Sequence, residues 1–117
     1  MFRRLFGGGT PDAPAGITVT EAQRKLADKE AIMLDVRERD EWRAGHVAGA
    51  RHIPLGDLRA HLAALPRDRD LLLLCQSGSR SGTATRLLHG HGFARVYNVS
   101  GGIIAWRRSG LPLTKGV

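Results

Sequence analysis

The segment LLLLCQSGSRS, residues 71–81, decides the fold of this chain. Its first four residues are leucines and are apolar on both faces, which is typical of a central strand in a parallel sheet. Cys75 stands where this strand ends, the small residues after it favour a tight loop, and a helical pattern begins at about Ser81. A buried strand, a loop and a helix in this order predict an α/β fold. Ligands bind at the carboxyl ends of strands in such folds.

Strand and helix patterns alternate on both sides of this segment. The predicted strands cover residues 31–36, 50–54, 71–74 and 95–99. The predicted helices cover residues 21–28, 38–44 and 81–89, with one more after Asp57 and a last one after Gly101-Gly102. The alternation predicts a parallel sheet with helices on both faces.

Three local signals refine the helices. Thr20 and Gln23 have the spacing of a capping box, which places the start of the first helix at residue 21. Asp57 is expected to cap a helix that carries three leucines on one face, at positions 58, 62 and 65. Trp42 is expected to pack inward from the short helix over 38–44.

The length of 117 residues fits one domain. Residues 1–16 are rich in Gly and Pro and are interpreted as a flexible tail and linker, and residues 17–117 as the folded domain. No segment reaches the roughly 18 apolar residues of a membrane span, and the first ten residues lack the apolar core of a signal peptide. We therefore expect no stable membrane association. Cys75 is the single cysteine, which favours a reducing, cytoplasmic setting.

The formal charge of +7 is unevenly distributed. Residues 71–117 contain six basic side chains and no acidic one, whereas residues 1–70 are almost balanced. The carboxyl-terminal part should therefore attract small anions or an acidic protein partner. No nucleic-acid-binding motif accompanies the arginines, so we expect no nucleic-acid partner.

The surroundings of Cys75 favour a reactive thiolate. Successive backbone N–H groups of a tight loop can converge on one anion, and the positive end of the following helix adds to this. Arg80 contributes a full charge and a fork that suits oxyanions. These features should lower the pKa of Cys75 and bind an anionic donor beside it. An inert core cysteine is the alternative, and the loop and the helix start argue against it.

The segment from Cys75 to Ser81 resembles the active-site loop C-x-S-G-x-R-S of the rhodanese family. Further motifs match in the same order. They are Asp35-Val36-Arg37 with Glu41, Gly45-His46-Val47 with Gly49-Ala50, Ile53-Pro54, and Gly101-Gly102 with Trp106 and Gly110. Together they span about residues 17–113.

The resemblance implies a rhodanese-like sheet of about five parallel strands. It also implies that Cys75 takes a sulfur atom from a small anionic donor, such as thiosulfate or a low-molecular-weight persulfide, and passes it to cyanide or a thiol. The residues implied to bind the donor are Gln76, Ser77, Gly78, Ser79, Arg80 and Ser81. Asp35 and Arg37 would support the site, or form a structural ion pair with each other or with Glu41. No cofactor and no metal ion are implied.

Several alternatives remain open at this point. Gln76 stands where many family members have Arg, which weakens the case for thiosulfate and favours a relay module that takes persulfide from a partner protein. Arg80 follows Cys75 by five positions, so the loop is one residue shorter than the C-x₅-R loop of cysteine phosphatases. A phosphatase or an arsenate reductase is therefore less favoured. A binding module with a vestigial loop is disfavoured by the intact motif from Cys75 to Ser81. His46 is expected to hold a loop by hydrogen bonds.

Overall fold

The computed structural model describes residues 16–117 and contains a five-stranded sheet in which all strands are parallel. The strand order is β1-β5-β4-β2-β3. The strands are β1 (Gly16–Ile17), β2 (Ala31–Asp35), β3 (Arg51–His52), β4 (Asp70–Leu74) and β5 (Val96–Val99). The helices are α1 (Val19–Ala27), α2 (Arg39–Ala44), the 3₁₀ helix η1 (Leu55–Ala64), α3 (Ser79–Gly90) and α4 (Gly102–Arg108). This confirms the predicted α/β class and the sheet with helices on both faces.

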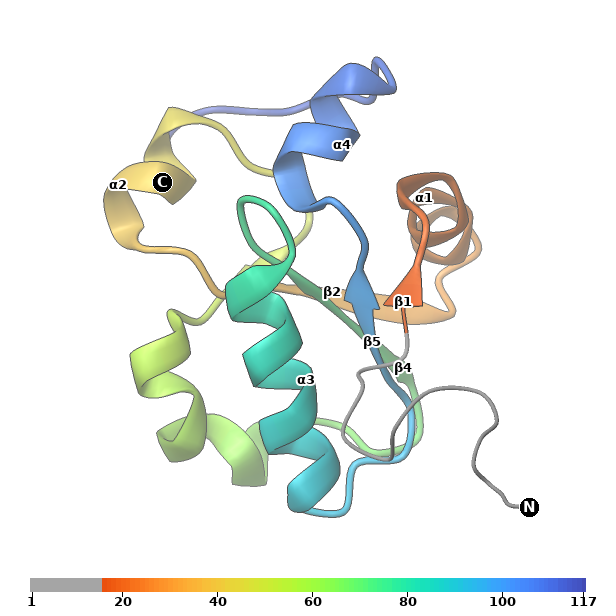
Figure 1. Ribbon diagram of the computed structural model, residues 1–117, viewed down its shortest axis with the longest axis vertical. Coiled ribbons are helices and arrows are strands. Elements are labelled where there is room, and N and C mark those ends of the chain that lie inside the picture. The colour runs from red at the N-terminus through yellow and green to blue at the C-terminus, as the bar shows by residue number, and fades with distance from the viewer. Residues whose placement is uncertain (1–15) are drawn as a thin grey trace, which may run out of the picture.

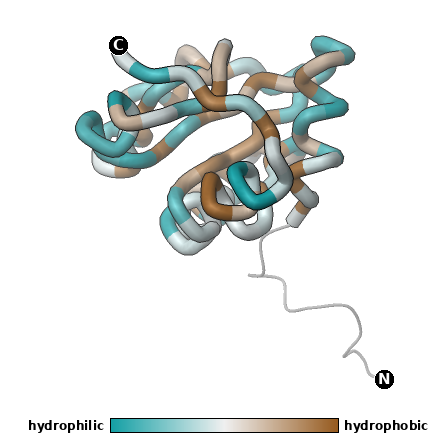
Figure 2. Tube along the Cα trace, turned by 90° about the horizontal axis from the view of Figure 1, so that it is seen from above, coloured by the Kyte–Doolittle hydropathy of each residue, from teal (hydrophilic) through white to brown (hydrophobic). Residues whose placement is uncertain are grey.

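The leucine strand β4 lies at the centre of the sheet and supplies both hydrophobic cores. Leu71 and Leu73 belong to the core under η1 and α3, while Leu72 and Leu74 belong to the core under α1 and α4. Figure 1 shows α1 and α3 on opposite sides of the sheet. The hydropathy colouring of Figure 2 places the brown, apolar segments inside and the teal, polar ones along the outer turns.

Two predicted helix starts are wrong. The first helix is capped by Thr18, whose hydroxyl accepts from the N–H of Glu21 (3.1 Å) while the Glu21 carboxylate accepts from the N–H of Thr18 (2.9 Å). With this start, Val19 is the first helical residue and is buried together with Ala22. A cap at Thr20 would leave Val19 outside the helix. Asp57 lies inside η1 and caps nothing, because that segment begins at Leu55 as a 3₁₀ helix.

Two further predictions need adjustment. Strand β1 had no signal in the sequence, because it has only two residues and pairs with β5 at Gly16 and Ile17. Gly16 therefore belongs to the sheet, while the rest of the predicted tail lies outside the described residues. Trp42 is half-buried instead of packed into a core, and its ring stacks on that of His46, with centroids 3.6 Å apart. Among residues 16–117, no helix is long and apolar enough to cross a membrane.

Candidate functional site

Cys75 follows the last residue of β4, at the carboxyl edge of the sheet, and is only 1% exposed. The loop after it runs between α2 and α4 (Figure 1). Helix α3 begins at Ser79, two residues earlier than predicted, because Gly78 adopts a left-handed conformation (φ 108°) that turns the chain into the helix. Ser79, Arg80 and Ser81 therefore form the first helical turn, where backbone N–H groups lack partners within the helix.

Hydrogen-bond donors from the loop and from the first turn of α3 point at the sulfur of Cys75. The N–H of Gly78 donates to Sγ over 3.1 Å, and the hydroxyl of Ser81 lies 3.3 Å from it. Burial raises the pKa of the Cys75 thiol, but hydrogen bonds from the Ser81 hydroxyl and from backbone N–H groups of the loop outweigh burial. The pKa of Cys75 is consequently lowered from its ordinary value of 9.0. A lowered pKa increases the thiolate fraction, and the thiolate is the nucleophilic form.

Helix α4 holds the other side of the loop. The N–H of Ile103 donates to the carbonyl of Cys75 (2.9 Å), and the N–H of Ile104 donates to that of Gln76 (3.2 Å). Gly102 makes this approach possible, because a Cβ atom there would lie 2.5 Å from each of these two carbonyl oxygens. The Gly101-Gly102 pair, which follows β5, thus lets the start of α4 approach the loop and hold it through these two hydrogen bonds.

Arg80 does not present a free fork. Its two terminal nitrogens donate to the two carboxylate oxygens of Glu41, at 2.7 and 2.8 Å, which ties α3 to α2. The hydrogen bond from Arg80 lowers the pKa of Glu41 to about 2. The ion pair is partly exposed, with 36% of the Arg80 side chain and 28% of the Glu41 side chain accessible. The charge of Arg80 near Cys75 is therefore largely offset.

Asp35 and Arg37 form a buried ion pair with each other. The guanidinium of Arg37 donates to both carboxylate oxygens of Asp35, with a shortest distance of 2.8 Å, and also to the carbonyl of Gly45. Asp35 and Arg37 are 0% and 2% exposed. This geometry agrees with the structural interpretation of the pair, because the Arg37 side chain links the end of β2 to the turn after α2 through the carbonyl of Gly45.

The structure also brings Asn98 of β5 to the loop, a residue that the sequence analysis missed. Its side-chain amide contacts both Ser81 and Gly78. The signal available in the sequence was a polar residue inside a mostly apolar strand, two positions before Ser100-Gly101-Gly102. His46 makes the kind of contact that was predicted, since its Nδ1 lies 2.8 Å from the carbonyl of Trp42.

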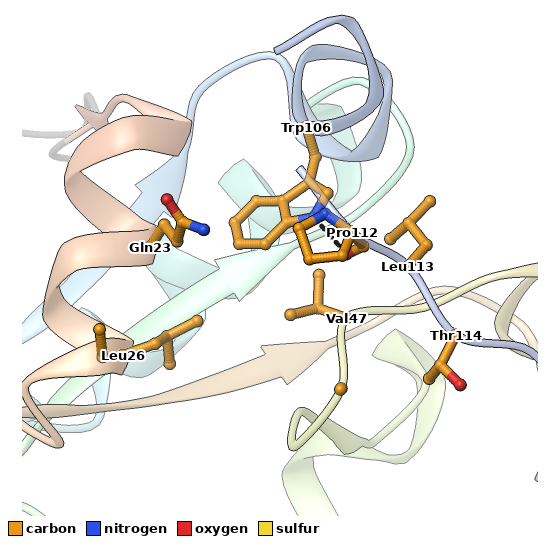
Figure 3. Close-up of a pocket in the computed structure, with 9 residues that line it drawn as sticks. Gln23, Leu26, Val47, Trp106, Pro112, Leu113 and Thr114 are labelled. Carbon is orange, nitrogen blue, oxygen red and sulfur yellow. Dashed lines mark hydrogen bonds between the residues drawn. The ribbon is translucent and has the colours of Figure 1, made fainter. Parts of the chain in front are cut away.

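A groove of about 450 Å³ lies elsewhere, between α1, α4 and the carboxyl-terminal segment. Figure 3 shows the Trp106 ring over Val47, with Gln23 and Leu26 of α1 across from it. Trp106 is 2% exposed and donates from Nε1 to the carbonyl of Pro112 (2.9 Å), so it is a core residue, as predicted. The residues lining this groove include no nucleophilic thiol and no ionisable side chain, so we place the candidate site at Cys75.

The protein-family model described as the Rhodanese-like domain matches residues 18–109 of the sequence. The chain belongs to the rhodanese-like family. This rhodanese-like domain is 40% identical over 91 residues to a sulfurtransferase of Allochromatium vinosum, a match that covers 77% of the chain and 85% of that protein.

Solved structures agree with the family. The crystal structure of a rhodanese-related protein from Thermoplasma volcanium superposes with a TM-score of 0.80 at 30% identity, covering 87% of this chain and 99% of that one. A thiosulfate sulfurtransferase of Pseudomonas aeruginosa gives a TM-score of 0.79 at 26% identity, covering 89% of this chain but 21% of that one. The match therefore spans nearly the whole of the first solved chain and about a fifth of the second.

Proposed function

We propose that this rhodanese-like domain is a sulfurtransferase in which Cys75 carries the transferred sulfur as a persulfide. The observation that carries the proposal is the set of donors directed at Sγ, because they stabilise an anion at that position. The names of relatives as sulfurtransferases support the same reaction class. A single, unpaired thiol suits a reducing compartment such as the cytoplasm.

The cycle has two displacements. In the first, the Cys75 thiolate attacks the outer sulfur of thiosulfate, the S–S bond of the donor breaks, and sulfite leaves with the bonding electron pair. The enzyme then holds a persulfide on Sγ, the atom to which the N–H of Gly78 donates before the sulfur is added. In the second, cyanide or a thiolate attacks the outer sulfur of this persulfide. Thiocyanate or a new persulfide leaves, and the Cys75 thiolate is restored.

The residues around Cys75 have distinct roles in this proposal. The N–H of Gly78 and the hydroxyl of Ser81 stabilise negative charge on sulfur. Gln76, Ser77 and Ser79 form the accessible rim over which the donor enters, with Ser77 and Ser79 exposed. Arg80 adds a charge near the sulfur, attenuated by Glu41.

A donor panel tests the function. The purified protein receives thiosulfate, glutathione persulfide and mercaptopyruvate in parallel, with cyanide or a thiol as acceptor. We expect turnover with at least one persulfide-type donor and none in Cys75→Ser. Equal turnover in wild type and Cys75→Ser would overturn the assignment.

A second function, a relay module fed by a partner protein, is favoured by the surface next to the loop. An open hollow of about 430 Å³ is lined by Ser77, Gly101, Ile104, Ala105, Arg108 and Ser109. Ile104 is an exposed large apolar side chain, at 36%, and Arg108 is also exposed. An apolar contact beside a cation suits an acidic protein surface better than it suits thiosulfate.

Substitutions in the hollow distinguish the two functions, because they should affect a protein-like donor more than a small donor. An acidic peptide carrying a cysteine persulfide serves as the protein-like donor, and a basic peptide of matched length serves as the control. If the relay operates, Ile104→Asn and Arg108→Gln reduce transfer from the acidic peptide by more than they change thiosulfate turnover. Equal transfer from the acidic and basic peptides would argue against the relay.

A further inference from the structure

Asn98 connects the sheet to the sulfur site by both ends of its amide. It lies on β5, where it pairs in parallel register with Leu73 of the central strand β4. Its Nδ2 donates to the carbonyl of Gly78 (3.1 Å), and its Oδ1 accepts from the hydroxyl of Ser81 (2.6 Å). Both contacted residues are themselves donors to Cys75.

The contact with Ser81 controls a shared proton. The hydroxyl of Ser81 lies 2.6 Å from Oδ1 of Asn98 and 3.3 Å from Sγ of Cys75, and it has one hydrogen to give. Ser81 is fully buried, so water does not provide another partner. When the sulfur is protonated, the hydrogen points to Asn98. When the sulfur is anionic it is the stronger acceptor, and the hydroxyl turns to it without moving its oxygen.

The contact with Gly78 fixes the second donor. The carbonyl of Gly78 accepts from Asn98 and from the N–H of Gly82 (3.0 Å), while the N–H of Gly78 donates to Sγ. Gly78 adopts a left-handed conformation, which favours glycine, and a glycine has no side chain to hold it in place. The amide of Asn98 supplies that restraint from the neighbouring strand.

We propose that Asn98 is a positioning residue for Cys75, holding the Ser81 hydroxyl and the Gly78 N–H at the distances from which they stabilise the thiolate. The inference rests on the proposed function insofar as Cys75 is the nucleophile. Asn98 does not touch the sulfur and has no contact with a reacting atom. It acts through the two groups that do.

The test measures the thiolate directly in the full chain. The rate of alkylation of Cys75 by iodoacetamide is followed against pH, which is unambiguous because Cys75 is the single cysteine. Asn98→Ala removes both contacts, and Asn98→Asp keeps the shape but places a carboxylate beside the thiolate and cannot donate to Gly78. Tyr97→Phe, on the same strand, is the matched control.

We expect the apparent pKa of the thiol to rise in the order wild type, Asn98→Ala, Asn98→Asp. In Asn98→Ala, displacement of the Gly78 N–H and of the Ser81 oxygen should outweigh the release of the Ser81 hydrogen from Oδ1. At neutral pH, alkylation should slow about three- to tenfold in the alanine variant and return towards the wild-type rate at high pH, because only the thiolate fraction has changed. The first sulfur-transfer step should show the same shift in its pH profile. Tyr97→Phe should behave as wild type.

Two results would overturn the inference. One is a lower melting temperature in both Asn98 variants with an unchanged thiol pKa, which is what a purely structural role predicts. The other is a thiol pKa in Asn98→Asp equal to that of the wild type. Aspartate has nearly the same size and shape as asparagine, so Asn98→Asp still tests the inference if the alanine variant does not fold. A chain that shows the pKa order but transfers no sulfur would refute the proposed function and leave this inference standing.

Discussion

The guanidinium of Arg80 and the carboxylate of Glu41 form a two-pronged ion pair that joins α3 to α2 beside Cys75. Oxygen Oε1 of Glu41 also accepts from the N–H of Glu38 (3.0 Å), so the carboxylate is fixed from both sides. The residue expected to attract an anionic donor is thereby held and partly neutralised. Donor preference then depends on Glu41 as much as on Arg80.

Glu41→Gln should improve the use of thiosulfate. The substitution removes a negative charge near an anionic donor and keeps one hydrogen-bond acceptor for Arg80. Because the pair is partly exposed, the gain should correspond to about 0.2–1 kcal/mol, seen as a lower KM at low salt that fades as salt rises. Glu30→Gln is the control, since Glu30 is exposed and precedes β2 at the opposite edge of the sheet. An unchanged KM at low salt would show that Glu41 does not act on the donor.

The same ion pair should make folding stability depend on pH. Arg80 lowers the pKa of Glu41 from 4.5 to about 2 in the folded chain, so folding favours the ionised carboxylate. This contribution is complete above the unfolded value of 4.5 and is lost as pH falls towards about 2. The pKa of Asp70 is also lowered, but Asp70 contributes equally to the pH dependence of the wild type and of Glu41→Gln, so it cancels in their comparison.

Urea unfolding of wild type and Glu41→Gln measures this dependence. The wild type should be the more stable protein at neutral pH, and the difference should shrink between pH 4.5 and about 2. A difference that stays constant through this window would mean that Glu41 does not titrate with a lowered pKa.

Gln76→Arg should raise kcat/KM for thiosulfate modestly. Gln76 is half-buried, and its carbonyl is held by the N–H of Ile104, so the backbone stays in place while the side chain changes. A charge at the rim is screened by solvent, so the gain should be about 0.2–1 kcal/mol and should decrease with salt. A neutral donor should respond little. No change for thiosulfate at low salt would shift support to the relay function.

Asp35→Asn should destabilise the fold. The substitution leaves the buried guanidinium of Arg37 without a full counter-charge, and breaking a buried pair in this way costs about 3–5 kcal/mol. Urea unfolding measures the loss, and Asp28→Asn, at an exposed position, should cost far less. Normal stability with impaired sulfur transfer would instead assign Asp35 to the site.

The features that the sequence predicted correctly are those with a local signal. The leucines of 71–74 marked the central strand, and Cys75 marked the residue after which the chain turns into the loop, although α3 begins at Ser79, earlier than predicted. The start of the first helix was predicted wrongly, since Thr18 and Thr20 both precede a suitable partner at the capping-box spacing. The burial of Val19, which goes with the Thr18 cap, depends on the tertiary structure.

The contacts between distant residues at the site could not be predicted from local sequence patterns. Glu41 and Arg80 are 39 positions apart, and Ser81 and Asn98 are 17 apart. Their meeting depends on which strands are neighbours: β4 lies between β2, which leads into α2, and β5, which carries Asn98. Spacing within one element contains no such information.

The most direct test of the account is the intact mass of the protein after thiosulfate treatment, comparing wild type with Cys75→Ser. Serine keeps the size of the side chain and cannot form a persulfide, and circular dichroism checks that the fold is retained. We predict one added sulfur atom on the wild type, its removal by cyanide, and no addition to the variant. Sulfur bound equally by both proteins, or full sulfur transfer by Cys75→Ser, would contradict the central role of Cys75.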